Sequence, residues 1–312
     1  MECDIVHHTQ QPEHDMTQAE LAYGHRPPRY RLPDETHLGR VRLQVADLER
    51  SLAWYQAVLG LDVLEREATD ASLAPQGQTS PLIELHEKRG VRPMPRRGLL
   101  GLYHYALLLP DRASLGRFIT HLGALGERAG MSDHFVSEAV YITDPDGLGI
   151  EVYADRPRSS WEHVDRQLTM ATNPLDVESV VAEAKGKPWT GMPRGTVVGH
   201  VHLYVGDIDK AAAFYHDVIG FDKVVWNYAG ALFMSAGGYH HHLGTNIWAA
   251  QAPPATDDDA RLMEWEIVVP DASEVQEVRA SVEAAQVAVT SDANGIVVRD
   301  PWGTAVRIRR TG

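Results

Sequence analysis

The stretch that decides the fold is VRLQVADLERSLAWYQAVLGLDV, residues 41–63, because a second copy of it occurs as VHLYVGDIDKAAAFYHDVIGFDK, residues 201–223. Each copy has the pattern of a strand, a helix that starts near an aspartate, a glycine that stops the helix and a new strand. Nine positions recur 160 residues later: Val41, Leu43, Val45, Asp47, Ala53, Tyr55, Val58, Gly60 and Asp62 return as Val201, Leu203, Val205, Asp207, Ala213, Tyr215, Val218, Gly220 and Asp222. A register kept for this long indicates an internal duplication.

The same offset relates LYHYALLLPD (102–111) to LMEWEIVVPD (262–271), and each half ends in an Asp-Pro-x-Gly turn. Four strand–helix–strand units therefore begin near residues 39, 102, 199 and 262. The pattern predicts an α+β fold in two homologous domains, residues 37–155 and 197–312. A polar N-terminal extension (1–36) precedes them, and a connector with a short helix (156–196) joins them.

Composition excludes several classes of protein. The 312 residues are 44% hydrophobic and carry a formal net charge of −14, which argues against a nucleic-acid surface. One cysteine, Cys3, excludes a disulfide framework and fits a reducing cytoplasm. No apolar run is long enough for a membrane span, and we expect no signal peptide. The 16 histidines leave His, Asp and Glu as the strong metal ligands.

The segment YITDPDGLGIEVY (141–153) raises the question of chemistry. It predicts a strand, an Asp-Pro-Asp-Gly turn and a second strand. Glu151 interrupts the apolar second strand, and its neighbours Ile150 and Val152 must face the other way. The glutamate is either a solvated strand residue or a carboxylate kept inside for chemistry.

Paired βαβββ units with FYxxVLGF-type helices and closing DPxGxxIE strands resemble the vicinal-oxygen-chelate superfamily of glyoxalases, bleomycin-resistance proteins and extradiol dioxygenases. The resemblance spans residues 37–309 and implies four βαβββ units that form two open-barrel modules. Two further stretches, IEVYADRPRSSW (150–161) and SAGGYHHHLGTNIWA (235–249), are similar to the two-domain catechol 2,3-dioxygenases. Some members of this superfamily bind ligands without catalysis, so the fold alone does not fix the activity.

In this family, metal ligands come from the first and last strands of a unit. The first-strand positions here are Arg40, His104, His200 and Glu264, and the last-strand positions are Glu151 and Arg307. Arginine cannot bind a metal, because its guanidinium stays protonated. Only a barrel of units two and three brings His104, Glu151 and His200 together, the ligand triad of non-heme Fe(II) oxygenases. We therefore expect this pairing, with Arg40, Glu264 and Arg307 in the other barrel, where carboxylate and guanidinium replace the metal by an ion pair.

The resemblance also implies residues beside the metal. Extradiol enzymes carry a tyrosine ten residues before the ligand glutamate, and Tyr141 reproduces this spacing. A phenol there can donate a hydrogen bond to bound substrate. The family also has a histidine further upstream, for which His134 is the candidate at a shorter spacing than usual.

The run His240–His242 is similar to the family's His-His-x-x-Ala stretch, in which one histidine is the acid–base catalyst. We assume a strand through 239–243, in which alternation places His240 and His242 on one face and His241 on the other. His241 is then the candidate base and His242 the alternative, since imidazole exchanges protons near neutrality. A solvated histidine cluster is the non-functional interpretation.

The resemblance thus implies an extradiol dioxygenase that converts catechol or a substituted catechol and O₂ to a 2-hydroxymuconic semialdehyde type of product. The alternative is a non-redox member of the superfamily, such as an isomerase, a lyase or a small-molecule binding protein. Fe(II) and Mn(II) share the ligand set, so the metal stays open. Strands at the barrel edges suit a symmetric homo-oligomer, but the oligomeric state and the ring substituents stay open as well.

Overall fold

The computed structural model describes residues 23–312, and these contain the four expected units. Unit one comprises β1 (His37–Val45), α1 (Leu48–Trp54) with the π-helical turn η1 (Tyr55–Leu59), β2 (Asp62–Arg66), β3 (Asp70–Ala74) and β4 (Ile83–Glu87). Unit two comprises β5 (Gly101–Leu108), α2 (Arg112–Leu125), β6 (Gly130–Asp133), β7 (Ser137–Thr143) and β8 (Gly149–Asp155).

The second half repeats this order. Unit three comprises β12 (Val197–Tyr204), α4 (Ile208–Ala212) with the π-helical turn η3 (Ala213–Ile219), β13 (Asp222–Val225), β14 (Ala231–Ser235) and β15 (Leu243–Asn246). Unit four comprises β16 (Arg261–Val269), α5 (Ala272–Ala284), β17 (Thr290–Asp292), β18 (Gly295–Arg299) and β19 (Ala305–Arg310). The predicted α+β fold of four βαβββ units is confirmed.

The repeated helix signals act as the sequence indicates. Asp47 and Asp207 are N-caps, and the side chain of each accepts a 3.0 Å hydrogen bond from a backbone N–H three residues later. Gly60 and Gly220 end the helical segments with φ of 68° and 104°. These left-handed conformations suit glycine, so both units leave the helix at the same point and enter the next strand in the same direction.

The strands of the four units form two large curled sheets, and each large sheet combines one unit from each half of the chain. The order β6-β7-β8-β5-β12-β15-β14-β13 joins units two and three, whereas β17-β18-β19-β16-β1-β4-β3-β2 joins units four and one. Antiparallel pairs close both seams, β5 with β12 and β1 with β16. The expected pairing of units two and three is therefore confirmed, and each open-barrel module crosses the boundary between the sequence halves.

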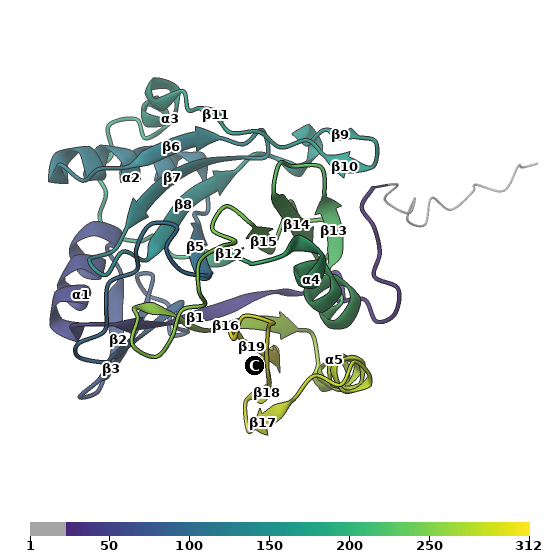
Figure 1. Ribbon diagram of the computed structural model, residues 1–312. Coiled ribbons are helices and arrows are strands. Elements are labelled where there is room, and N and C mark those ends of the chain that lie inside the picture. Colours follow the sequence, from purple (N-terminus) through teal and green to yellow (C-terminus); the bar gives the residue numbers. More distant parts are fainter. Residues whose placement is uncertain (1–22) are drawn as a thin grey trace, which may run out of the picture.

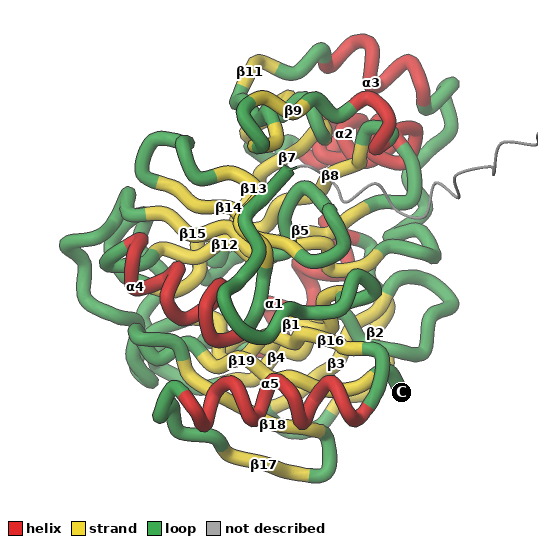
Figure 2. Tube along the Cα trace, turned by 90° about the vertical axis from the view of Figure 1, so that its right-hand side faces the viewer, coloured by secondary structure: helices red, strands yellow, loops and turns green. Residues whose placement is uncertain are grey.

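The two large sheets lie one above the other in both views, with α5 packed against the sheet of units one and four (Figure 1 and Figure 2). The central strands β1 and β12 approach each other between the sheets. One continuous hydrophobic cluster fills this region and includes residues from all four units, among them Tyr55, Tyr105, Tyr215 and Trp265, each fully buried. A shared core of this kind couples the two modules mechanically.

The connector folds over the sheet of units two and three. It contains the 3₁₀ turn η2 (Arg158–Ser160), β9 (His163–Val164), β10 (Gln167–Leu168), β11 (Asn173–Pro174) and α3 (Val177–Glu183). Its expected short helix is thus present, and β11 adds a strand to β6. Of the N-terminal extension, residues 1–22, which include Cys3, lie outside the described residues, whereas Tyr23 and the residues after it pack against units three and four.

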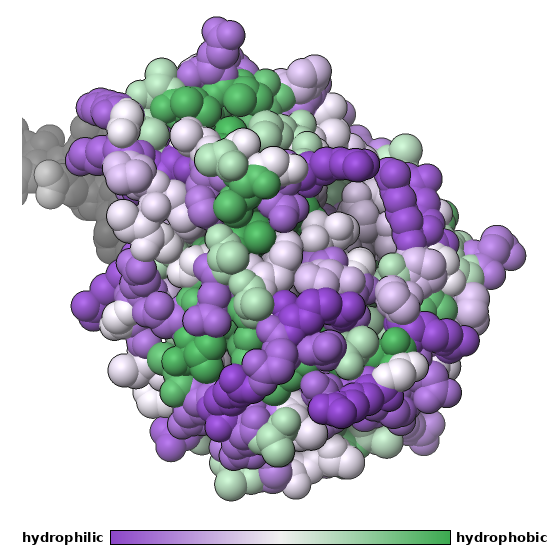
Figure 3. Space-filling model, turned by 90° about the vertical axis from the view of Figure 1, so that its left-hand side faces the viewer, coloured by the Kyte–Doolittle hydropathy of each residue, from purple (hydrophilic) through white to green (hydrophobic). Residues whose placement is uncertain are grey.

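One face of the molecule carries hydrophilic side chains that separate small hydrophobic patches (Figure 3). Within residues 23–312 no helix is long and apolar enough to cross a membrane.

Candidate metal centre and active site

We call the module of units two and three the first module. In it, three adjacent strands, β8, β5 and β12, bring Glu151, His104 and His200 together. Glu151 Oε2 lies 3.0 Å from His104 Nε2 and 3.1 Å from His200 Nε2, and one ligand atom from each residue lies within 4.8 Å of the others. The three residues are 4%, 2% and 1% exposed for His104, Glu151 and His200. Glu151 is thus not a solvated strand residue, and its carboxylate points inward.

A glycine lets the strands approach closely enough for this arrangement. A Cβ on Gly149 of β8 would lie 2.1 Å from the carbonyl oxygen of Tyr103 and 3.3 Å from the Cβ of His104 on β5. A side chain at residue 149 would therefore push β8 away from β5 and move Glu151 away from His104.

Several ring nitrogens of the triad lack a hydrogen-bond partner in the protein, which indicates a metal site. Both ring nitrogens of His104 and Nδ1 of His200 are buried without a hydrogen-bond partner, and the 3.0 Å approach of His104 Nε2 to Glu151 lacks hydrogen-bond geometry. Buried polar atoms are rarely left unpaired, because each one costs about 1–3 kcal/mol. Two imidazoles and one carboxylate that converge on one point form a donor set suited to a divalent transition metal.

The electrostatics favour the ligand forms of all three side chains. Burial by itself would raise the pKa of the Glu151 carboxyl, but His200 and His104 outweigh burial and hold that pKa well below its usual range. Burial lowers the pKa of His104 and of His200, against the opposing effect of Glu151. A carboxylate beside two imidazoles is the protonation state that binds metal.

Tyr141 lies directly opposite Glu151 in the β7–β8 pair. Its hydroxyl is 2.6 Å from His134 Nε2, and His134 Nδ1 is 2.6 Å from the carbonyl oxygen of Ala171 in the connector. Because a carbonyl only accepts, Nδ1 carries a proton, and Nε2 is left to accept from the Tyr141 hydroxyl. The structure therefore places His134 against Tyr141, although its sequence spacing is short.

The three successive histidines do not lie in a strand, so that expectation was wrong. Residues 239–242 form a bend, and β15 begins at Leu243. His241 nevertheless lines the pocket, with its ring centroid 4.0 Å from that of His200. His242 lies elsewhere: its Nδ1 accepts a 3.1 Å hydrogen bond from the Ala236 N–H. Two glycines, Gly237 and Gly238, have left-handed backbones (φ 58° and 64°) and interrupt the extended run.

A chain of side chains holds His241. Asp155 Oδ1 lies 2.9 Å from His240 Nε2, and His240 Nδ1 lies 2.8 Å from His241 Nδ1. A carboxylate accepts, so His240 Nε2 carries its proton and His240 Nδ1 is the acceptor of the next bond. His241 Nδ1 then donates, which leaves His241 Nε2 with a free lone pair. Burial lowers the pKa of His241 well below its usual range, as do the surrounding histidines.

The pocket around these residues has a volume of about 710 Å³. Its aromatic wall consists of Tyr103, Tyr228, Phe233 and Trp248, and the connector contributes Met170, Ala171 and Thr172. Sequence reasoning missed these residues because they come from separate segments. It also missed His202, whose Nε2 lies 3.0 Å from Asn246 Nδ2 and whose ring centroid lies 5.1 Å from that of His104. Its position two residues after His200, on the same strand face, was an available signal.

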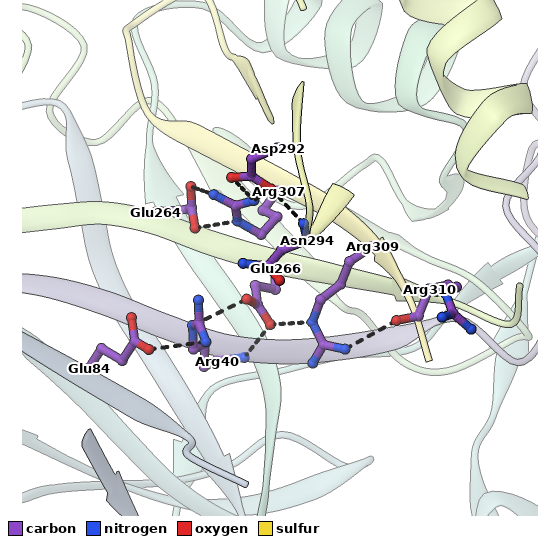
Figure 4. Close-up of polar contacts among 9 residues, drawn as sticks. All are labelled: Arg40, Glu84, Glu264, Glu266, Asp292, Asn294, Arg307, Arg309 and Arg310. Atoms are coloured by element: carbon purple, nitrogen blue, oxygen red, sulfur yellow. Dashed lines mark hydrogen bonds and ion pairs between the residues drawn. The ribbon is translucent and has the colours of Figure 1, made fainter. Parts of the chain in front are cut away.

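The second module, formed by units one and four, has ion pairs at the positions that correspond to the triad of the first module (Figure 4). Arg307 Nε donates to Glu264 Oε1 at 2.8 Å, which confirms the expected carboxylate–guanidinium pair. Arg40 does not join this pair. It contacts Glu84 at 3.0 Å and the buried Glu266 at 3.2 Å. Among residues 23–312, His, Cys, Asp and Glu side chains converge as possible metal ligands at one place, the triad of the first module.

Known proteins share this architecture. A model of the glyoxalase/bleomycin resistance protein/dioxygenase superfamily matches residues 37–152 and 197–308. The chain is 44% identical over 273 residues to a catechol-2,3-dioxygenase of Bacillus subtilis (strain 168), and the match covers 86% of this chain and 95% of that protein.

Two solved structures have a similar fold at low identity. One is a Bacillus subtilis protein provisionally described as a dioxygenase, with a TM-score of 0.61, 13% identity and coverage of 90% of this chain and 86% of the other. The second is glyoxalase I of Zea mays, with a TM-score of 0.54, 15% identity and coverage of 88% and 92%. At these identities the likeness concerns the fold alone.

Proposed function

Because the chain belongs to the glyoxalase/bleomycin resistance protein/dioxygenase superfamily, we propose that it is an extradiol dioxygenase. It takes catechol or a substituted catechol and O₂, breaks the ring bond next to the diol, and gives a product of the 2-hydroxymuconic semialdehyde type. The observation that supports this most strongly is the buried His104–Glu151–His200 triad, of which His104 and Glu151 line one pocket together with Tyr141 and His241. The sequence relationship to a catechol-2,3-dioxygenase supports the same reaction.

We assign His104, Glu151 and His200 as the ligands of one Fe(II), or Mn(II), per chain. Three protein ligands leave positions open on such a metal, which when bound supplies the redox chemistry of the reaction with O₂. The other roles belong to the chain's own side chains. The pocket walls orient the aromatic ring, and the connector covers the pocket from one side, which limits the access of water.

His241 is the proton acceptor in this proposal. Its Nε2 lone pair is free because Nδ1 is engaged by His240, and the pocket-lining ring is positioned to take a proton from a diol hydroxyl and return it later. Asp155 and His240 are positioning residues that fix this tautomer. When substrate binds, the Tyr141 hydroxyl turns from His134 Nε2, to which it donates in the free protein, and donates instead to an oxygen atom of the reacting species.

A non-redox reaction has less support. A glyoxalase-type site prefers two glutamates among its ligands, and in the described part of the chain Glu151 is the one carboxylate that lines the pocket. A binding protein would have no need of the Asp155–His240–His241 chain.

The test is direct. Protein loaded anaerobically with Fe(II) is mixed with catechol and air-saturated buffer, and O₂ uptake is followed together with absorbance. We expect one O₂ consumed per catechol and a yellow product. Glu151→Ala serves as the matched control without a complete metal site. Metal-loaded protein that consumes no O₂ with catechol or any substituted catechol would overturn the proposal.

A further inference from the structure

One cationic side chain lines the otherwise aromatic and imidazole-rich pocket: the guanidinium of Arg97. Within residues 23–312 no carboxylate forms an ion pair with it, whereas most arginines near it in sequence, such as Arg89 and Arg92, have one. The Tyr204 hydroxyl lies near it: burial raises the pKa of that phenol to about 12, and the charge of Arg97 opposes this rise. An arginine without a paired carboxylate keeps its full charge and most of its donors available to a ligand.

The loop that carries Arg97 is fixed in place. Pro93 and Pro95 stiffen it, and backbone hydrogen bonds attach it at both ends, from Met94 N–H to Asp146 (2.7 Å) and from Leu100 N–H to Pro253 (2.8 Å). Arg97 itself has a left-handed backbone with φ of 55°, which is unfavourable for a long side chain. Such a conformation persists where the surroundings enforce it, and here it directs the side chain to the pocket.

Arg97 lies within reach of a substituent on a ring bound at the triad. Tyr103 connects the two places: its ring centroid is 4.6 Å from that of His104 and 4.8 Å from that of Tyr204, whose pKa the charge of Arg97 lowers. Arg97 also acts on Tyr103 directly, because its charge opposes the rise that burial causes in the pKa of Tyr103. A side chain of a few bonds on the substrate ring would pass Tyr103 and arrive at the guanidinium.

The size of the pocket favours a substrate larger than catechol. A volume of about 710 Å³ falls in the range of roughly 300–1,000 Å³ that buries drug-sized ligands. An unsubstituted benzenediol would leave much of this space to water. The described carboxylate that lines the pocket, Glu151, is committed to the metal, so an anionic substituent would find Arg97 without a competitor.

We propose that Arg97 is a specificity-determining residue and that the preferred substrates are catechols whose ring carries a short side chain ending in a carboxylate. This inference rests on the proposed dioxygenase function and narrows its substrate class. The bidentate donors of a guanidinium match a carboxylate, and a hydrogen bond to a charged group is worth roughly tenfold to a hundredfold in affinity. The formal charge of −14 opposes an anion only at long range, where salt screens it beyond about 8 Å.

The test compares acids with neutral analogues of the same shape. The probes are catechols with a carboxylate directly on the ring or after one or two methylene groups, each paired with its primary amide. For the Fe(II)-loaded protein, Kd is measured anaerobically by calorimetry and kcat/KM aerobically by O₂ uptake. We expect the wild type to favour at least one acid over its amide by roughly tenfold or more. Arg97→Gln should abolish this preference, and Arg97→Lys should retain part of it.

Arg96→Gln is the matched control, since Arg96 and Arg97 are both exposed but only Arg97 lines the pocket. It should keep the acid preference. A wild type that binds acids and amides equally, or an Arg97→Gln variant with an unchanged acid-to-amide ratio in Kd, would overturn the inference. Acid binding that depends on Arg97 without any ring cleavage would uphold it and refute the dioxygenase function instead.

Discussion

The hydroxyl of Tyr55 donates a hydrogen bond to Asp144 across 3.1 Å in the buried core. Tyr55 belongs to the helical segment of unit one and Asp144 to the closing turn of unit two. The second half repeats the contact, with Tyr215 donating to Asp300 at 3.0 Å. The sheets join unit one to four and two to three, whereas these bonds join one to two and three to four. Each unit is therefore fastened to two others.

The Asp144 carboxyl gives a pH-dependent stability. Burial raises its pKa to about 7, against the hydrogen bonds from the Asp146 and Leu148 N–H groups. The folded state thus holds a proton that the unfolded state has released above its own pKa of about 3.9. The stability that this proton contributes is complete below the pKa of the unfolded state and is lost as pH rises through the folded-state pKa of about 7.

Asp144→Asn should therefore flatten the fall in unfolding free energy between pH 5 and pH 8, because its amide is neutral throughout and its oxygen can still accept both N–H bonds. Urea denaturation of metal-loaded protein at the two pH values measures this. Asp209→Asn, at an exposed position of α4, is the control and should behave as wild type. A fall of the same size in Asp144→Asn and wild type would contradict the assignment.

Removal of a triad ligand should remove the metal. Elemental analysis of protein loaded with Fe(II) should find one equivalent in the wild type and little in Glu151→Ala or His200→Ala, because two ligands hold a divalent ion poorly. Glu264→Gln, at the corresponding place of the second module, should keep one equivalent. Two equivalents in the wild type, lost on substitution of Glu264, would show that the second module also binds metal.

Tyr141→Phe should fold normally and keep its iron, since the ring and the three ligands are unchanged. Turnover should fall by roughly ten- to a thousandfold, the usual effect of removing one placed donor. His134→Gln provides a second variant, expected to lower turnover less because the tyrosine hydroxyl remains. Wild-type turnover in Tyr141→Phe would mean that this residue only fills space.

The histidine run can be tested one position at a time. His241→Phe should retain iron and bind catechol, yet lose ~10²–10⁴-fold in turnover, the range for general acid–base catalysis. His242→Gln should stay within about tenfold of wild type, because His242 contacts the Ala236 N–H and does not line the pocket. An inactive His242→Gln variant together with an active His241→Phe variant would assign the acid–base role to His242 instead of His241.

Asp155→Asn tests the positioning of His241. An amide N–H facing His240 would invert both tautomers and place a proton on His241 Nε2, where the lone pair is needed. Turnover should fall by at least about tenfold with iron content unchanged. The turnover of His240→Phe should fall by a similar factor. The double variant should have no lower turnover than either single variant, because both substitutions break the same Asp155–His240–His241 series of hydrogen bonds. Additive losses would mean that the two residues act separately.

Periodicity and internal repetition predicted most of the fold. The aspartate caps and stopping glycines are local signals, so the helical segments begin and end where the sequence places them. The pairing of units followed from chemistry, because only one pairing gathers two histidines and one glutamate. The prediction of a strand through 239–243 was wrong because Gly237 and Gly238 change the backbone direction. Arg97, Tyr228 and the connector wall were missed because their proximity depends on long-range packing that no short pattern encodes.

The crossing of the modules has a consequence for how the enzyme can be divided. His104 and Glu151 belong to the first half of the chain and His200 to the second, so neither half contains all three metal ligands. Fragments cut within the connector would each be inert, and their reassociation would rebuild the centre from both sides. Metal retention is thus a reporter of complete assembly: a nascent or nicked chain that lacks its other half has too few ligands to hold a metal ion.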